Sequence, residues 1–269
     1  MLNFFSIFLL FCSFQNSTLA EEKIKKFDHQ HSLFQKVLNK YIIQINPSET
    51  RVHYSGLKKE PEILNQYLEQ VSLVTKENYK KWDSKQRLSF LINAYNAFTL
   101  KWIVKNYPTS SIKKTVGFFS NPWKQEFFKL FGEDSYLDQI EHQFIRKNFK
   151  EPRIHFAVNC ASIGCPALSK KVYTSENLET QLEENTLLFL KDSTRNRIDK
   201  KNKIVYLSKI FDWYESDFEK YSKSVPNFVS SRISNDSAIQ NAIKNRTYKI
   251  KHLDYDWNLN KIPDNGKTK

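Results

Sequence analysis

A broad apolar stripe between residues 84 and 107 predicts the strongest helix of the chain. Its apolar side chains recur at helical spacing: Leu88, Leu91, Ile92, Tyr95, Phe98, Trp102 and Ile103. Asp83 and Gln86 have the spacing of a capping box at the start of this helix. Pro108 disfavours helical geometry at Tyr107, so we expect the helix to end there.

The rest of the sequence predicts the α+β class. Hydrophobic residues make up 40% and aromatic residues 14% of the chain, which is enough for a real core. Further helical patterns lie within residues 21–50, 61–71, 135–145 and 178–190. Short strand-like runs lie at residues 51–54, 154–158 and 203–207. The sequence therefore predicts a helix-rich single domain with a small, mostly antiparallel sheet. We expect a signal peptide at 1–20, an N-terminal helical extension at 21–50, a globular domain at 51–262 and a flexible tail at 263–269.

The N-terminus has the pattern of a secretory signal peptide. Residues 4–14 form an apolar run of signal-peptide length, and Ala20 places a small residue before the expected cleavage point. Two alternatives are a lipoprotein modified at Cys12 and a retained anchor. Cleavage would leave a secreted or periplasmic protein with no transmembrane segment in the mature chain.

The charge and glycine content limit the classes of ligand. The formal net charge is +13, but the lysines are scattered and mixed with acidic residues. No nucleic-acid-binding module is evident, so we expect no nucleic-acid partner. The chain has five glycines and no phosphate-binding glycine loop, and we expect no cofactor. The expected ligand is a small molecule, a peptide or an envelope polymer, and a basic surface favours anionic or glycan partners.

Cys160 is the first candidate for chemistry. It follows the strand-like run at residues 154–158, and a side chain at a strand end can reach a cleft while the sheet holds it. A reactive thiol needs a base or positive charge nearby to become a thiolate. The alternative is a structural disulfide with Cys165, because Gly164 lets the chain reverse between the two and an exported protein meets oxidising conditions.

Two histidines lie near Cys160 in sequence. If residues 155–160 are extended, His155 lies roughly 16 Å from Cys160, at about 3.3 Å per residue, and cannot contact it. His142, on the preceding helix, is then the better base. Asp138 stands four residues before His142 and can orient its imidazole, whereas Glu141 should project in a different direction.

Other polar residues have both structural and functional interpretations. Asn93 and Asn96 interrupt a good helix, so they hydrogen-bond either a buried loop or a substrate. One of three acidic residues in an aromatic turn, Asp212, Glu215 or Asp217, could orient a histidine, although aromatic packing is the default for this turn. No metal-binding pattern is present, since the His and Cys spacing matches no closed zinc site.

Several motifs together resemble the domain-of-unknown-function family 547. They are YSGL at 54–57, LINAYNA at 91–97, LDQIEH at 137–142, IHFAVNCAS at 154–162 with CP at 165–166, LSKIF at 207–211, WY at 213–214, DF at 217–218 and YDWNLN at 255–260. The resemblance covers roughly residues 50–260 and implies a single compact domain. It draws attention to Asn93, Glu141, His142, His155 and Cys160. It supplies no reaction.

Two functions fit these observations. The first is a thiol-dependent hydrolase or acyltransferase in which Cys160 attacks, His142 accepts its proton, and Asp138 or Glu141 orients the imidazole. His155 or Asn159 would then stabilise the oxyanion. The second is a non-catalytic binding module of the cell envelope, or a secreted one, with a structural Cys160–Cys165 pair.

Overall fold

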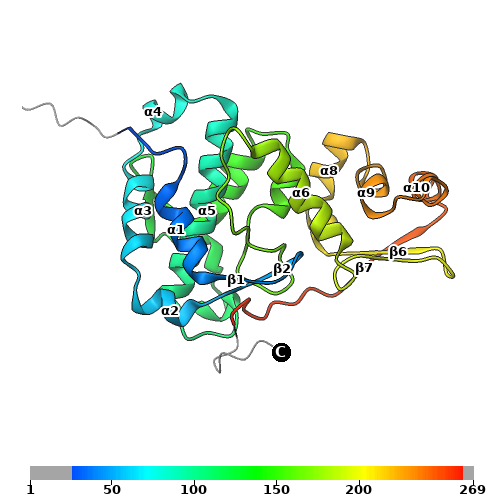
Figure 1. Cartoon of the computed structure of the whole chain (residues 1–269), viewed down its shortest axis with the longest axis horizontal. Coiled ribbons are helices and arrows are strands. Elements are labelled where there is room, and N and C mark those ends of the chain that lie inside the picture. The colour runs from blue at the N-terminus through cyan, green and yellow to red at the C-terminus, as the bar shows by residue number, and fades with distance from the viewer. Residues whose placement is uncertain (1–25, 263–269) are drawn as a thin grey trace, which may run out of the picture.

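The long helix α5 (Ser84–Asn106) forms the centre of the N-terminal half of the protein (Figure 1). The computed structural model describes residues 26–262. The capping box is confirmed, because the Asp83 carboxylate accepts the Gln86 backbone N–H at 2.9 Å and the Gln86 side chain accepts the Asp83 N–H at 3.1 Å. Pro108 follows the C-cap residue Tyr107, as expected. Nearly the whole surface of α5 is buried from Leu88 onwards.

Shorter helices surround α5 and form the first hydrophobic core with it (Figure 1). They are α1 (Ser32–Tyr41), α2 (Tyr54–Lys59), α3 (Glu62–Ser72) and α4 (Lys76–Lys81). The Phe34 ring of α1 stacks on the Tyr67 ring of α3, with 5.0 Å between the ring centroids. The N-terminal segment is therefore packed into the core.

The C-terminal half builds a second hydrophobic core around Phe156, Phe211 and Phe228. Its helices are α6 (Leu178–Lys191), α7 (Ile210–Trp213), α8 (Glu215–Ser222), α9 (Val225–Ile233) and α10 (Ser237–Lys244). They pack beside a three-stranded sheet of β5 (Arg197–Asp199), β6 (Ile204–Leu207) and β7 (Lys249–His252), in which β5–β6 is antiparallel and β6–β7 parallel. The predicted helix at 178–190 and strand at 203–207 are confirmed.

Two hairpins complete the sheet content. The first joins β1 (Ile42–Asn46) to β2 (Glu49–Val52), and the second joins β3 (Phe128–Leu130) to β4 (Glu133–Ser135); both are antiparallel. The helix predicted across 21–50 is therefore wrong beyond Tyr41, where the chain turns into β1. In β1 only Ile42 is buried, so the helical apolar spacing ends with α1.

The predicted strand at 154–158 is also wrong. Residues Pro152–Phe156 form the 3-10 helix η4, and Ala157 continues with helical backbone angles. The proline at the first helical turn is compatible with this start. Ile154 faces the first core and Phe156 the second, so η4 joins the two.

The helix predicted near residues 135–145 is present, with a different geometry. It is the π-helix η3 (Gln139–Arg146), which three residues separate from the end of β4. Ser135 belongs to β4. The short 3-10 helices η1 (Ile112–Thr115) and η2 (Pro122–Lys124) lie between α5 and β3.

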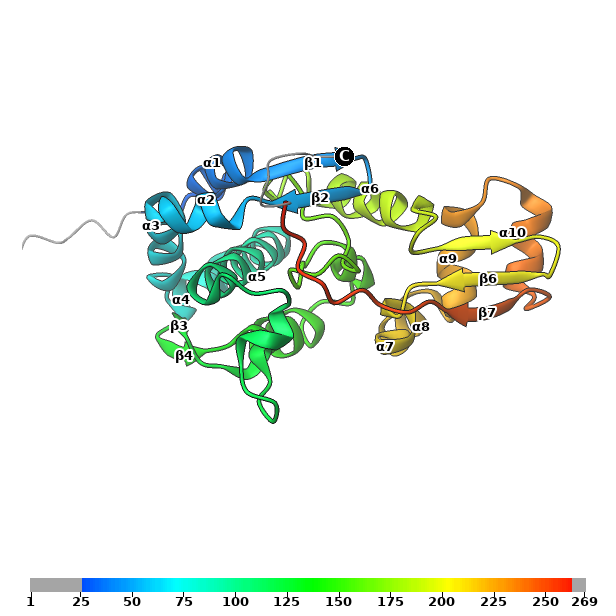
Figure 2. The same cartoon turned by 90° about the horizontal axis from the view of Figure 1, so that it is seen from below.

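After β7, the C-terminal segment returns across the molecule to the N-terminal half (Figure 2). Asn260 accepts the Val52 N–H through its carbonyl at 2.8 Å, and Ile163 and Gly164 donate to the carbonyls of Asn258 and Asp256, each at 2.8 Å. This segment therefore holds the loop that contains the two cysteines.

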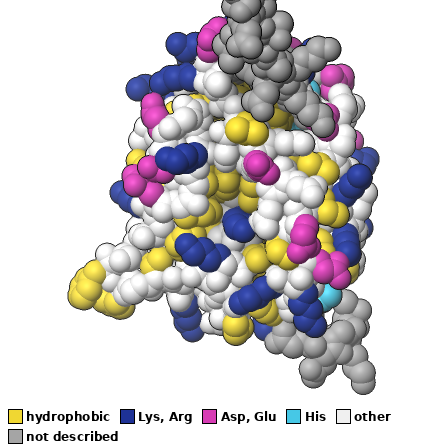
Figure 3. All heavy atoms as spheres, turned by 90° about the vertical axis from the view of Figure 1, so that its left-hand side faces the viewer, with side chains coloured by type: hydrophobic (Ala, Val, Ile, Leu, Met, Phe, Trp, Pro, Cys, Tyr) yellow, Lys and Arg dark blue, Asp and Glu magenta, His cyan; other side chains and the backbone are white. Residues whose placement is uncertain are grey.

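The α+β class is confirmed, with helices dominating and small, mostly antiparallel sheets. The signal-peptide prediction at 1–20 and the tail predicted at 263–269 fall outside the described residues. Within residues 26–262 no helix combines the length and apolarity needed to cross a bilayer. On the face in Figure 3, Lys and Arg side chains are dispersed among acidic and uncharged ones.

Candidate functional site

A cleft of about 290 Å³ collects most of the residues that the sequence singles out. It is lined from α5, η2 and its N-cap, η3 and the residue before it, η4, the cysteine loop, α7 with the residue after it, and the C-terminal segment. The lining residues are Tyr95, Asn121, Trp123, Asp138, Glu141, His142, His155, Val158, Cys160, Cys165, Pro166, Ile210, Trp213, Tyr214, Tyr255 and Trp257. All five predicted catalytic residues thus line one cleft, while their roles stay predictions.

The 3-10 geometry of η4 shortens the chain path between His155 and Cys160, and both residues line the cleft. The expected separation of these residues assumed an extended chain, but a 3-10 helix rises only about 2.0 Å per residue. His142 was preferred as the base because an extended chain would hold His155 too far from Cys160. Since the chain is not extended here, that reason no longer applies. Glu141 lines the cleft as well, and its carboxylate contacts Tyr214 whereas the His142 ring contacts Arg146, so these neighbours have different partners.

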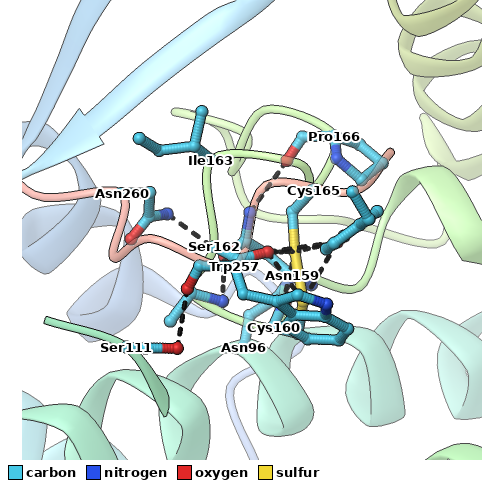
Figure 4. Close-up of a disulfide and its surroundings, with 12 residues drawn as sticks. Asn96, Ser111, Asn159, Cys160, Ser162, Ile163, Cys165, Pro166, Trp257 and Asn260 are labelled. Atoms are coloured by element: carbon cyan, nitrogen blue, oxygen red, sulfur yellow. Dashed lines mark hydrogen bonds between the residues drawn. A yellow bond between two sulfur atoms is a disulfide. The ribbon is translucent and has the colours of Figure 1, made fainter. Parts of the chain in front are cut away.

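The structure joins Cys160 and Cys165 by a disulfide (Figure 4). Cys160 is half-buried, whereas Cys165 is 3% exposed. This is the second of the two alternatives left open by the sequence. In this state neither sulfur is available as an attacking thiolate.

Two donors point at Cys165 Sγ, and a serine hydroxyl supports one of them. The Cys160 backbone N–H lies 3.1 Å from Cys165 Sγ, and the Tyr255 hydroxyl lies 3.1 Å from the same sulfur. Ser162 Oγ donates to the Tyr255 hydroxyl at 3.1 Å, which leaves the Tyr255 proton to point at sulfur. Burial raises the pKa of Tyr255, so its hydroxyl stays a donor.

Asn159 fixes the start of the cysteine loop. Its side chain donates to the Pro166 carbonyl at 2.8 Å and accepts the Ala161 N–H at 2.8 Å. Ala161 has a φ of 62°, in the left-handed region that a residue with a Cβ rarely adopts. The Asn159 contacts hold this strained turn in place.

The asparagines of α5 also hold loops. Asn93 donates to the Tyr173 carbonyl at 2.7 Å and accepts the Tyr173 N–H at 3.0 Å. Asn96 donates to the Ala157 carbonyl at 2.9 Å and accepts the Asn159 N–H at 2.8 Å. These are the buried-loop contacts that the sequence offered as one of two interpretations. Asn93, Asn96 and Asn159 are not among the residues that line the cleft.

The ion pair between Asp217 and Arg146 holds His155 in place. Its Nε2 lies 2.9 Å from Asp217 Oδ2, and Asp217 accepts two further hydrogen bonds from Arg146, at 2.6 and 3.0 Å. Asp217 therefore orients a histidine, which is the alternative to the default of aromatic packing for this turn. Burial lowers the pKa of His155, and the hydrogen bond to Asp217 only partly offsets this. The neutral ring carries its proton on Nε2, and its buried Nδ1 has no hydrogen-bond partner among the described residues.

His142 differs from His155 in that its Nδ1 has a hydrogen-bond partner. Arg146 Nη1 lies 3.0 Å from His142 Nδ1, and because a guanidinium only donates, Nδ1 accepts. The proton is then on Nε2, which faces Asp138 Oδ1 at 3.8 Å. Burial raises the pKa of Asp138, with the Glu141 charge adding to the effect and His142 opposing it. The lone pair of His142 is thus already engaged, which weakens its predicted role as a base.

Glu141 is a buried carboxylate at 5% exposure. Tyr214 donates its hydroxyl to Glu141 Oε1 at 2.7 Å, and the Tyr95 hydroxyl also interacts with this carboxylate. Burial raises the pKa of both tyrosines, and the Glu141 charge raises each further. The Tyr214 ring also stacks on His155 with 3.7 Å between centroids, so Glu141 and His155 are linked through one side chain.

Several site residues were not predicted as such from the sequence: Tyr95, Arg146, Trp123, Tyr214, Tyr255 and Trp257. Most of them lie inside the quoted motifs, which was the available signal. Among residues 26–262 no group of three or more His, Cys, Asp or Glu side chains is placed to hold a metal ion.

Residues 79–190 match the family model described as "Protein of unknown function, DUF547". The resemblance seen in the sequence is therefore confirmed over this segment, which contains η3, η4 and both cysteines. Tyr214, Asp217 and Tyr255 lie beyond it. No curated protein and no solved structure matches the chain.

Proposed function

We propose that the cleft binds a small polyhydroxy ring, such as one sugar unit of a glycan, and that the protein acts as an exported binding module. The observation that carries this proposal is that three tryptophans and a buried carboxylate, Glu141, which forms no ion pair within residues 26–262, line the same cleft. Small-ligand sites commonly combine aromatic walls with a few polar groups. The cleft volume of about 290 Å³ suits a single ring.

The aromatic wall comes from two segments. Trp213, at the end of α7, stacks on Trp257 of the C-terminal segment with 5.7 Å between centroids. Tyr255 lies 4.6 Å from Trp257, and Trp123 lies 5.8 Å from it, edge-on. Trp213 is 45% exposed, so a large flat surface stays open to a ligand. Aromatic faces of this kind pack against the apolar faces of sugar rings.

The polar side of the cleft favours hydroxyl or amino groups over anions. Asp138 and Glu141 both line it, and in the described part of the chain no Lys, Arg or His nitrogen forms an ion pair with Glu141. Arg146 is already paired with Asp217. Carboxylates accept hydrogen bonds and repel other anions, so a neutral or amino sugar fits better than a uronic or phosphorylated one.

The test is calorimetric titration of the purified protein with neutral, amino and uronic monosaccharides. We expect measurable binding of the first two classes and weaker binding of the third. Trp213→Ala should weaken binding about tenfold, which is the loss of one stacking surface. Tyr221→Ala is the matched control, because Tyr221 is also 45% exposed and lies outside the cleft. Absence of binding at millimolar concentrations for all three classes would refute the proposal.

Export is part of this proposal and rests on the sequence of residues 1–20. We expect the protein in the secreted or periplasmic fraction, with a mature N-terminus at Glu21. Fractionation followed by N-terminal mass spectrometry decides this. An intact Met1 terminus in the cytoplasmic fraction would contradict it.

A thiol-dependent hydrolase or acyltransferase is the second candidate. It is favoured by His155, whose Nε2 is held by Asp217 and whose Nδ1 has no hydrogen-bond partner in the described residues. This function requires reduction of the Cys160–Cys165 disulfide. After reduction, the rate of thiol labelling at Cys160 measured against pH should reveal a lowered pKa that His155→Ala abolishes. An ordinary thiol pKa in both proteins would exclude it.

A further inference from the structure

The Cys160–Cys165 disulfide lies in the wall of the cleft, and its two sulfur atoms have different surroundings. Cys160 is half-buried, and Cys165 is 3% exposed. We propose that this disulfide is a thiol-exchange site: a small thiol attacks Cys160 Sγ from the cleft, and Cys165 leaves as the thiolate. This inference does not depend on sugar binding.

The difference in access fixes which sulfur is attacked. An entering thiolate needs an open path to the sulfur, and Cys160 is the more accessible of the two. Cys165 lies in the buried part of the loop, held by the contacts of the C-terminal segment with Ile163 and Gly164. Attack at Cys160 therefore leaves Cys165 as the departing group.

The donors around Cys165 suit a departing thiolate. The Cys160 N–H and the Tyr255 hydroxyl each lie 3.1 Å from Cys165 Sγ, and Ser162 donates to Tyr255. A neutral disulfide sulfur is a weak acceptor and gains little from two donors. A thiolate gains far more, because hydrogen bonds to charged acceptors are stronger. Exchange is faster when the leaving thiolate is stabilised.

Gly164 allows this arrangement. A Cβ at this position would lie 2.9 Å from two atoms of the Tyr255 ring and 3.0 Å from the Asp256 backbone nitrogen. Only a glycine lets the Tyr255 ring pack this closely over the loop and reach both sulfur atoms, at 3.1 Å from Cys165 and 3.3 Å from Cys160. The placement of Tyr255 is thus a specific feature of the loop.

The attacking thiols supply the electrons and the protons that the exchange reaction needs. A thiolate RS⁻ forms an S–S bond to Cys160, the bond between Cys160 and Cys165 breaks, and Cys165 takes the electron pair as a thiolate. A second thiolate then attacks the R sulfur of the mixed disulfide, releasing RSSR and the Cys160 thiolate. The two thiolates bind the protons given up by the two thiols. Two electrons pass from the thiol pair to the protein disulfide.

The first experiment locates the attacked sulfur. The full chain carrying Cys12→Ser, oxidised, is treated with reduced glutathione and quenched with N-ethylmaleimide. Fragment-ion mass spectrometry of the tryptic peptide 154–170 should show glutathione on Cys160 and maleimide on Cys165. Glutathione on Cys165, equal labelling of both, or the absence of a Cys160–Cys165 disulfide before treatment would overturn the proposal.

The second experiment tests the donor. In the same Cys12→Ser background, Tyr255→Phe should slow reduction of the disulfide by glutathione about tenfold, because the leaving thiolate loses one donor. Tyr221→Phe, outside the cleft, should reduce at the rate of the parent. Thermal unfolding of both variants checks that the fold is retained, and Ser162→Ala gives a second, smaller slowing. Equal rates for Tyr255→Phe and the parent would overturn the proposal.

Discussion

Replacing Asp217 by Asn tests whether the ion pair beneath the cleft holds the site together. The substitution keeps the size of the side chain and removes its charge. Asp217 accepts hydrogen bonds from Arg146 at 2.6 and 3.0 Å and from His155 at 2.9 Å. An amide can accept with one oxygen only, so Asp217→Asn leaves at least one of these donors without a partner.

The expected loss of stability is about 3 kcal/mol. Removing one partner of a buried ion pair costs about 3–5 kcal/mol, and the lower end applies because the Arg146 side chain is 25% exposed. For a protein of this size, 1 kcal/mol corresponds to roughly 2–4 °C in Tm, so we expect Tm to fall by about 6–12 °C.

The pH dependence gives a second signature. Burial opposes ionisation of Asp217, but the hydrogen bonds from His155 and Arg146 outweigh it and hold the pKa of Asp217 well below its usual range. A lowered carboxylate pKa contributes stability that is present above the pKa of the unfolded state, about 4, and is lost as the pH falls toward the folded pKa. The difference between wild type and Asp217→Asn should therefore be full at pH 7 and shrink below about pH 4.

Urea denaturation followed by circular dichroism measures both effects. Asp212→Asn is the matched control, because among residues 26–262 this exposed carboxylate of the same aromatic turn pairs with Lys209 alone, at 3.2 Å, and should change stability by less than about 0.5 kcal/mol. If Asp217→Asn unfolds at the same urea concentration as Asp212→Asn, the ion pair does not stabilise the site and the reasoning fails.

Two further predictions concern loop packing. Gly164→Ala should cost about 1–3 kcal/mol, because its Cβ would press on the Tyr255 ring and on fixed backbone, whereas Gly117→Ala meets open space and should be neutral in the same thermal-unfolding assay. Asn93→Ala should cost about 2 kcal/mol by leaving the buried backbone groups of Tyr173 without partners; hydrogen exchange at the Tyr173 amide should quicken, and unchanged protection there would refute this.

The fold was predictable where the local sequence pattern of a segment specifies the same structure that its burial in the core requires. The stripe and capping box of α5 specify a long helix from local sequence alone, and the structure buries that stripe as expected. The run at 154–158 misled because a short apolar stretch fits a strand and a single helical turn equally well. Pro152 at the start of η4 was the local sign of a helical turn.

The sequence could predict which residues belong to the site better than it could predict what each of them does there. The motifs placed Glu141, His142 and Cys160 together, but the partner of a histidine is set by packing between distant segments. Asp217 reaches His155 only because α8 packs on η4, and no local spacing encodes that contact. The sequence could name Asp217 as one of three candidates and no more.

The π-helical geometry of η3 was not predictable from the sequence. In an α-helix successive side chains are about 100° apart, which is why Glu141 was expected to project away from His142. A π-helix has a wider turn, with hydrogen bonds to the fifth residue, so neighbouring side chains diverge less. Its apolar spacing over so short a segment resembles that of an α-helix, and only the backbone hydrogen bonds distinguish the two. Glu141 and His142 both line the cleft, yet their side chains have different partners: Glu141 accepts from Tyr214, whereas His142 accepts from Arg146 and faces Asp138.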